Sequence, residues 1–313
     1  MNPSIVLLPN WIGDMLLALS VISKLPESRL SNMTLLVPKN MGSLVGLLCG
    51  LPQIAFARAD EGEVKHTLAL VRAGGFSTIY LCPFSFSSAW FAMKAGIQQR
   101  RGLSKQMRRF LLSEPLSGNL RDKTRHLTFE YAEIFGTSFF PPEEWNGVRI
   151  VPDERFAGSI VYCPGAAYGP AKRWPHFPAL AKLQEQYSIV VLGTDDDSES
   201  AREILQHAHG RGIDLTGKTS LTEAAAIMAG ARAVVSNDSG LMHLAGYIGV
   251  PVIGLFGSTS PVWTRPLGHK SVALKSAEPC SPCFSRTCRY RHYRCQENIS
   301  PNNVTEALES LCG

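Results

Sequence analysis

Short apolar runs that alternate with helix-forming segments restrict the fold of this chain more than any other feature. The runs lie at residues 4–8, 33–37, 54–57, 78–82, 159–163, 188–192, 233–236, 252–256 and 271–274. Amphipathic or apolar stretches of helix-forming residues lie between most of them. Strands that alternate with helices form parallel sheets covered on both faces. The sequence therefore predicts an α/β protein.

The length of 313 residues exceeds what one hydrophobic core usually covers, so two domains are expected. A polar, turn-rich stretch at 137–158, containing Pro141, Pro142 and Pro152, is the predicted linker. We expect one Rossmann-like domain over 1–150 and a second over 151–313. A helix at 301–311, opened by a proline, is expected to close the second domain.

Composition excludes global disorder and a membrane-spanning chain. The hydrophobic fraction is 45% and the charged fraction 18%, as in an ordinary globular protein. No apolar run reaches the roughly 18 residues that a membrane span needs. The first 22 residues lack a basic start and are interrupted by Asn10, Gly13 and Asp14, so we interpret them as a strand and a helix. A cytoplasmic protein is expected. Its net charge of +5 suggests an acidic partner without selecting one.

The loop after the first strand runs from Pro9 to Asp14. Gly13 permits a sharp turn or a close approach to a ligand. Asp14 stands at a predicted helix start, where the helix dipole favours an ionised carboxylate, so it could accept a proton from a hydroxyl group. A plain helix N-cap is the alternative, and the two roles are compatible.

Two loops of the second half are suited to binding a diphosphate. Residues 163–175 are rich in small residues and then offer Lys172 and Arg173, which can contact phosphate, although a solvated basic loop is the alternative. Residues 236–243 join a strand to a helix whose first N–H groups would be unpaired. There the candidates are Asp238, Ser239, Gly240 and His243, and the alternative is a capped helix with a core histidine. In a third loop, 193–197, Asp195 could meet ribose hydroxyls or cap a helix.

Basic residues gather in the first half. Arg100, Arg101, Lys105, Arg108 and Arg109 lie within ten residues that contain no acid. They predict either a solvated face or a wall that binds acidic acceptors. Nucleic acid is not expected as a partner, because no nucleic-acid-binding motif accompanies this charge.

Four of the eight cysteines cluster in the second half. Cys280, Cys283, Cys288 and Cys295 are spaced C-x₂-C-x₄-C-x₆-C. They could hold a structural zinc ion, pair as disulfides in air, or remain free thiols. None of these interpretations is catalytic.

Taken together, the three loops resemble the ADP-heptose:lipopolysaccharide heptosyltransferase family. The matching stretches are Asn10–Met15, Cys163–Gly165, Lys172–Pro175, Asn237–His243 and Gly257–Pro261. The loops at 163–175 and 236–243 are most similar to heptosyltransferase II. Three interpretations remain beside this resemblance: a related GT-B glycosyltransferase that uses another nucleotide sugar or acceptor, a nucleotide-sugar epimerase, and a non-catalytic zinc- or anion-binding protein. A nicotinamide dehydrogenase is disfavoured, because no GxGxxG follows the first strand.

The resemblance implies a GT-B fold, with two Rossmann-like domains facing across a cleft, and an inverting transfer of heptose to the lipopolysaccharide inner core without a cofactor. It implies that Asp14 is the base and that Lys172 is catalytic by contacting the donor phosphate. The implied ADP-heptose contacts are Gly13, Lys172, Asp195, Asp238, Ser239, Gly240 and His243. A Kdo- or heptose-bearing lipid A acceptor would meet Asn10, Trp11, Arg100, Arg101 and Lys105. The basic surface could hold the enzyme peripherally at the inner face of the inner membrane.

Overall fold

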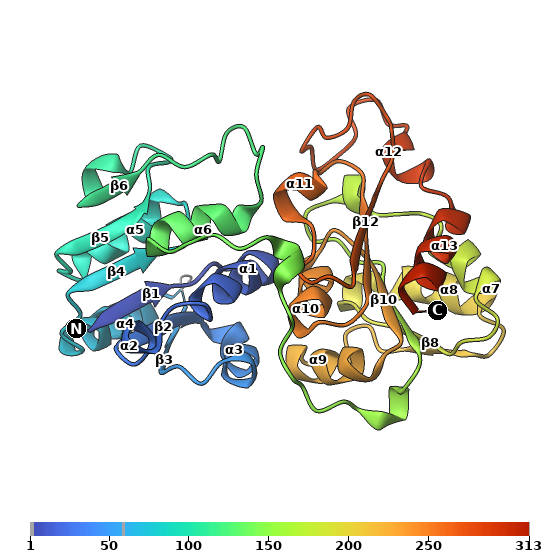
Figure 1. The fold of residues 1–313 in the computed structure, drawn as a ribbon, viewed down its shortest axis with the longest axis horizontal. Helices are drawn as coiled ribbons and strands as arrows, with labels where there is room; N and C mark the ends of the chain where they lie inside the picture. The colour runs from blue at the N-terminus through green and yellow to red at the C-terminus, as the bar shows by residue number, and fades with distance from the viewer. Residues whose placement is uncertain (1–2, 58–59, 313) are drawn as a thin grey trace. The chain divides into compact units, whose positions relative to one another are not determined.

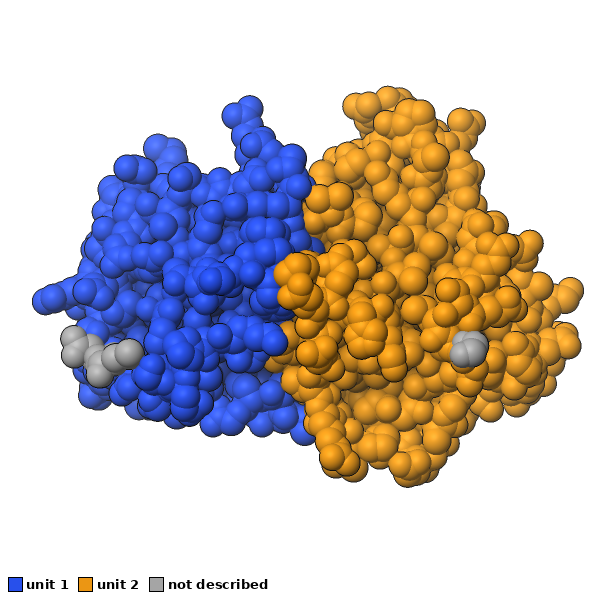
Figure 2. Space-filling view, in the orientation of Figure 1, with its two compact units in different colours: residues 1–140 blue, residues 141–313 orange. Residues whose placement is uncertain are grey.

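The computed structural model describes residues 3–57 and 60–312, and the chain divides into two compact units, residues 1–140 and 141–313 (Figure 2). The division falls inside the predicted linker at 137–158 and before the expected boundary at 150. Contacts of the segment after residue 140 explain this position. The indole N–H of Trp145 donates to the Tyr247 carbonyl at 2.6 Å, and Gly268 N donates to the Pro142 carbonyl at 2.8 Å. The predicted linker is thus part of the second unit from Pro141 onward.

Unit 1 is built on a six-stranded parallel sheet with the strand order β3-β2-β1-β4-β5-β6 (Figure 1). Its strands are β1 (Ser4–Leu7), β2 (Met33–Pro38), β3 (Gln53–Phe56), β4 (Thr78–Leu81), β5 (Gln99–Leu103) and β6 (Glu114–Leu116). Its α-helices are α1 (Ile12–Ile22), α2 (Glu27–Leu30), α3 (Gly42–Leu48), α4 (Glu61–Ala73), α5 (Phe86–Lys94) and α6 (Leu127–Phe135).

Unit 2 has its own six-stranded parallel sheet, in the order β12-β11-β10-β7-β8-β9. Its strands are β7 (Ile160–Cys163), β8 (Ile189–Val191), β9 (Gly212–Asp214), β10 (Ala233–Asn237), β11 (Val252–Phe256) and β12 (Ser271–Lys275). Its α-helices are α7 (Phe177–Leu183), α8 (Ser198–His207), α9 (Leu221–Gly230), α10 (Gly240–Ile248), α11 (Pro261–Thr264), α12 (Arg294–Glu297) and α13 (Pro301–Cys312).

Burial explains why the apolar runs form central strands. Every residue of β1, β7, β10 and β11 is buried, as expected for parallel strands covered on both faces. Helix α1 is buried from Met15 to Ile22, which agrees with its almost continuous apolar sequence. Helices α6 and α10 end at Gly136 and Gly249, whose left-handed backbone (φ 60° and 84°) closes each helix at no steric cost.

Three strands were not predicted, namely β5, β6 and β9. They lie at or next to a sheet edge, and their sequences are short and polar, as in Gln-Arg-Arg-Gly-Leu for β5. Arg100 and Arg101, which the sequence placed in a basic wall, are therefore strand residues.

The strand order fixes where a ligand can bind in each unit. When the strands of each unit are renumbered from its first strand, both sheets have the order 3-2-1-4-5-6. In sheets of this order, a crevice for ligands opens at the carboxyl ends of the strands, at the point where the order reverses. In unit 1 this point lies between β1 and β4, and in unit 2 between β7 and β10.

Candidate functional site

Two loops of unit 2 come together at the carboxyl edge of its sheet. One follows β7 and the other follows β10, and these strands are hydrogen-bonded neighbours. The loops hold the predicted residues Lys172, Asp238 and Ser239, and helix α10 starts at Gly240 with His243 in its first turn. The structure thus gathers the main predicted donor residues in one place.

A buried amide joins the two loops. The Nδ2 of Asn237 donates to the Pro164 carbonyl at 2.6 Å, and its Oδ1 accepts from Trp174 N at 3.0 Å. The indole N–H of Trp174 in turn donates to the Ile299 carbonyl at 2.8 Å. In the sequence, Asn237 is notable only as the first residue of the Asn237–His243 motif. Its position at the end of a buried strand was the one available signal of this bridging role.

The centre of the site is an ion pair between Lys172 and Asp238. The Lys172 Nζ donates to Asp238 Oδ2 at 2.6 Å and to the Asp238 carbonyl at 3.2 Å. The Thr259 hydroxyl donates to the same Oδ2 at 2.6 Å. The two charged side chains are only 13% and 4% exposed. Asp238 was predicted to lie beside a phosphate site, where an unpaired carboxylate would repel the phosphate. Its charge is neutralised by Lys172, the lysine predicted to bind that phosphate.

His243 lies behind this pair. Its Nε2 is 3.9 Å from Asp238 Oδ1, and its Nδ1 has no hydrogen-bond partner among the described residues. Burial lowers the pKa of His243 to about 4, the Lys172 charge acts in the same direction, and the Asp238 charge opposes both. His243 is therefore neutral near pH 7, and Lys172 remains the cation that Asp238 binds.

The first turn of α10 faces the loop with its backbone donors. Ser239 occupies the N-cap position in an extended conformation, yet its side chain makes no capping hydrogen bond to the helix. Its Oγ lies 3.3 Å from the Ser236 Oγ. Because the Ser239 side chain does not accept hydrogen bonds from these N–H groups, they are available to bind an anion at the start of the helix.

The loop after β8 contributes a structural carboxylate. Asp195 is exposed, as a ribose contact would require, whereas Asp197 is buried. Asp197 accepts from Thr194 N at 3.0 Å and from the Arg173 guanidinium at 3.1 Å. A Cβ on Gly165 would come within 2.4 Å of Asp197 Oδ2, so that loop needs glycine. Nothing in the sequence distinguishes Asp197 from the neighbouring Asp195 and Asp196.

The cysteine-rich segment is attached to the lysine loop. The Tyr168 hydroxyl donates to the Phe284 carbonyl at 2.6 Å, and Ala171 N donates to the Arg286 carbonyl at 3.1 Å. Both Lys172 Nζ and the Arg286 guanidinium lie over the Tyr168 ring, at 4.9 and 5.3 Å from its centroid. This segment therefore supports the position of Lys172.

The four clustered cysteines, Cys280, Cys283, Cys288 and Cys295, have free thiols in the structure. Within residues 3–57 and 60–312, no group of three or more His, Cys, Asp or Glu side chains is arranged to hold a metal ion. The zinc interpretation stays a prediction.

In unit 1, the predicted base lies at the carboxyl end of β1. Asn10 and Trp11 are exposed, Trp11 is the N-cap of α1, and Gly13 and Asp14 belong to the first turn of the helix. Asp14 is therefore the third helical residue, and the N-cap alternative is wrong because the helix begins two residues earlier. The buried Tyr131 of α6 lies near Asp14. Burial and the Asp14 charge raise the pKa of Tyr131 well above its usual value, so its phenol stays neutral.

Two of the predicted acceptor residues are engaged inside unit 1. Arg100 donates to the carbonyls of Ile97 and Leu111, at 2.6 and 2.7 Å. Arg101 donates to the last carbonyls of α6 and pairs with Glu114 at 2.7 Å. Lys105, by contrast, is exposed. The guanidinium groups of Arg100 and Arg101 thus hold the sheet edge and cap a helix.

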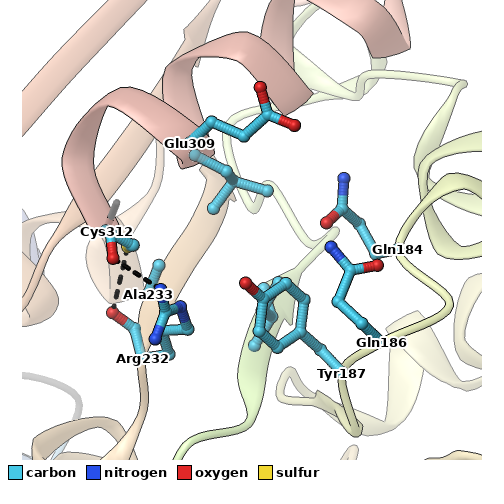
Figure 3. Close-up of a pocket in the computed structure, with 9 residues that line it drawn as sticks. Gln184, Gln186, Tyr187, Arg232, Ala233, Glu309 and Cys312 are labelled. Carbon is cyan, nitrogen blue, oxygen red and sulfur yellow. Dashed lines mark hydrogen bonds between the residues drawn. The ribbon is translucent and has the colours of Figure 1, made fainter.

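A cavity of about 110 Å³ lies at the other end of the unit 2 strands, away from the two loops described above (Figure 3). It is lined by residues at the amino ends of strands, including Ile160, Tyr187 and Ala233, and by Cys312 of α13. Since ligands of such sheets bind at the carboxyl edge, this cavity is separate from the candidate site.

Within the described part of the chain, none of the helices combines the length and apolar character that a membrane span requires.

Comparison with known proteins agrees with this geometry. Lipopolysaccharide heptosyltransferase 2 of Escherichia coli K12 is 30% identical over 350 residues, covering 98% of this chain and 97% of that protein. Lipopolysaccharide heptosyltransferase 1 of Pseudomonas aeruginosa PAO1 is 46% identical over 254 residues, covering 72% of this chain and 70% of that protein. The structure of E. coli ADP-heptose LPS heptosyltransferase II matches with a TM-score of 0.81 at 26% identity, covering 99% of this chain and 98% of that chain.

A family model described as glycosyltransferase family 9 (heptosyltransferase) matches residues 65–294. The predicted α/β architecture, its GT-B type and the predicted family are all confirmed by these matches and by the two parallel sheets. This chain belongs to glycosyltransferase family 9, the heptosyltransferases.

Proposed function

We propose that this enzyme transfers heptose from ADP-L-glycero-D-manno-heptose to the inner core of lipopolysaccharide, as heptosyltransferase II does. The observation that carries the proposal is the Lys172–Asp238 pair beside the start of α10, at the point where the strand order of unit 2 reverses. Two relatives that match over nearly the full length, one in sequence and one in structure, are named heptosyltransferase 2 or II.

The donor diphosphate would lie between Lys172 and the first turn of α10. Lys172 uses two hydrogen bonds on Asp238, and an ammonium group has a third N–H to offer a phosphate oxygen. The α10 amides and the Ser239 hydroxyl would supply further donors. Asp238 would then orient the ammonium group without presenting a net negative charge. The exposed Asp195 is proposed to meet the ribose.

The transfer itself needs a base and a stabilised leaving group. Asp14 takes the proton of the acceptor hydroxyl, whose oxygen forms a bond to the anomeric carbon of the heptose. The bond from that carbon to the β-phosphate oxygen breaks, and ADP leaves with inversion at the sugar. Lys172 and the amides beside Gly240 stabilise the charge that develops on ADP.

The proposed acceptor is a lipid A that already carries Kdo and heptose. Asn10, Trp11 and Lys105 remain its proposed contacts, because they are exposed in the unit that holds Asp14. Arg100 and Arg101 are not retained, because their guanidinium donors are bound to carbonyl and carboxylate oxygens of unit 1. The acceptor is lipid-linked, so the enzyme is proposed to act in the cytoplasm, peripherally at the inner face of the inner membrane.

The proposed chemistry requires no cofactor. Lys172 and backbone N–H groups would carry out the charge stabilisation that a metal ion supplies in other transferases. Zinc held by Cys280, Cys283, Cys288 and Cys295 would have a structural role only.

Replacing the proposed base should slow the chemical step and leave donor binding intact. Asp14→Asn keeps the size of the side chain and removes its basicity, so turnover should fall by roughly 10²–10⁴-fold. ADP release in the presence of acceptor measures turnover, and calorimetric titration measures ADP affinity. Asp122→Asn, at an exposed acid elsewhere in unit 1, is the control. Near-normal turnover in Asp14→Asn would exclude Asp14 as the base.

Replacing Lys172 should weaken ADP binding. Lys172→Met removes a charge-assisted hydrogen bond, and we expect ADP affinity to fall by about 10- to 100-fold. Lys172→Met/Asp238→Asn, which leaves no buried carboxylate without its cation, tests whether the loss comes from Lys172 itself. Lys182→Met, at an exposed lysine of α7, should bind ADP as the wild type does. Unchanged ADP affinity in Lys172→Met would refute the proposed phosphate contact.

The neutral state of His243 predicts a pH-dependent stability. The folded-state pKa is about 4 and the ordinary value is 6.5, so between these values the unfolded chain binds more protons. The contribution to the free energy of unfolding is complete above pH 6.5 and is lost as pH falls toward 4, by about 3 kcal/mol in all. Urea unfolding at pH 7 and pH 4 should show this loss in the wild type and in an exposed-residue control, His207→Gln. His243→Gln should show a smaller loss, and an equal loss would contradict the assignment.

A further inference from the structure

Unit 1 carries a group of large, exposed apolar side chains on helix α5 and on the segment between β5 and β6. Phe86, Trp90, Met107 and Phe110 form this aromatic patch, and they are 40%, 44%, 87% and 73% exposed. The ring centroids of Phe86 and Trp90 are 6.3 Å apart, and those of Phe86 and Phe110 are 6.1 Å apart. Single exposed apolar residues need no explanation, whereas a contiguous patch of large ones indicates a binding surface.

The patch is held in place by polar contacts beneath it. Arg108, the residue between Met107 and Arg109, is fully buried and donates to Leu103 O at 2.8 Å and to Pro83 O at 2.6 Å. Burial lowers the pKa of Arg108 to about 10, so the side chain remains charged at neutral pH. The Gln106 side chain also accepts from Phe86 N at 3.2 Å. Met107 and Phe110 are thus presented outward by a loop fastened to the start of α5.

Two cations, Lys94 and Arg109, flank the patch. The Lys94 Nζ lies 5.1 Å from the centroid of the Trp90 ring, and Arg109 is exposed beside Phe110. From Val64 to Ser113 the sequence contains no Asp or Glu. Aromatic side chains with flanking lysine and arginine are the combination that binds the interface of an anionic bilayer, where rings enter the headgroup layer and cations meet phosphates.

The patch also starts beside the proposed acceptor site. Helix α5 follows β4, helix α1 with Asp14 follows β1, and these two strands are neighbours in the sheet. A lipid-linked acceptor must bring its sugar to Asp14 while its acyl chains remain in the bilayer. A membrane-binding surface on this side of unit 1 would meet that requirement, an argument that rests on the proposed function.

We propose that the aromatic patch, with Lys94 and Arg109, docks unit 1 on the anionic surface of a phospholipid bilayer. Trp90 and Phe110 enter the headgroup region and the two cations bind lipid phosphates. The bilayer itself is the partner, independent of the sugar acceptor.

Sedimentation with acceptor-free vesicles tests the docking surface. The wild type should bind phosphatidylcholine vesicles that contain phosphatidylglycerol, and bind vesicles of phosphatidylcholine alone much less. Trp90→Ser/Phe110→Ser should weaken partition about tenfold or more, because two large apolar side chains no longer enter the bilayer. Lys94→Gln/Arg109→Gln should weaken it about fivefold per cation, and this part should vanish at high salt.

Matched variants of unit 2 serve as controls. Leu183→Ser removes an apolar residue of similar exposure, 47%, and Lys182→Gln removes a neighbouring exposed cation. Both should bind vesicles as the wild type does. The proposal is overturned if the patch variants bind as well as the controls, or if the wild type does not bind anionic vesicles at low salt. It is equally overturned if Trp90→Ser/Phe110→Ser dissociates a dimer without changing vesicle binding, because a second copy would then cover the patch.

Two further measurements separate docking from catalysis. Lipids brominated on their acyl chains should quench wild-type tryptophan fluorescence, and Trp90→Phe, which keeps the apolar bulk, should still bind vesicles but lose most of that quenching. Trp90→Ser/Phe110→Ser should also retain heptose transfer to a deacylated, soluble acceptor and lose it with vesicle-embedded acceptor. Failure of the wild type on the soluble acceptor would contradict the proposed function, whereas the vesicle-binding results decide the patch independently.

Discussion

The ion pair between Lys172 and Asp238 is the interaction on which the proposed donor site depends. Buried charges are costly unless they are paired and hydrogen-bonded, and here Thr259 and the Asp238 carbonyl complete the pairing. Because burial lowers the pKa of His243 to about 4, the imidazole is neutral near pH 7 and does not compete with Lys172 for the Asp238 carboxylate. A preorganised ammonium group beside the α10 amides needs little rearrangement when a diphosphate arrives, and such preorganisation is what makes electrostatic stabilisation effective in catalysis.

The pair exists because the sheet of unit 2 brings distant segments together. Lys172 and Asp238 are 66 positions apart, and they meet because β7 and β10 are neighbours at the reversal of strand order. Asn237 fixes the separation of the two loops. Unit 1 repeats the same strand order, and its reversal point carries Asp14 on the first turn of α1. The same strand order thus carries a lysine–aspartate ion pair in one unit and a carboxylate in the other.

Much of this arrangement could be predicted from the sequence, and the features that could not be predicted share a physical reason. The buried central strands and the loops with Asp14, Lys172 and Asp238 were predicted, because apolar runs and glycine-rich turns are local signals. The edge strands β5, β6 and β9 were missed, because their polar residues lack such a pattern. Asp197 and the Lys172–Asp238 pair were missed because they depend on contacts across the sheet. Arg100 was predicted to bind the acceptor, but its guanidinium donates to backbone carbonyls of unit 1. These carbonyls come close only through the tertiary structure, so the sequence pattern could not show them.

Transfer to a defined acceptor tests the central claim most directly. The purified enzyme would be given ADP-heptose with two acceptors, a lipid A core that ends in Kdo and one that already carries a heptose, and the products identified by mass spectrometry. The account predicts addition of one heptose to the heptose-bearing acceptor, with one ADP released for each sugar transferred. Addition only to the acceptor that ends in Kdo, or ADP release without any sugar addition, would contradict it.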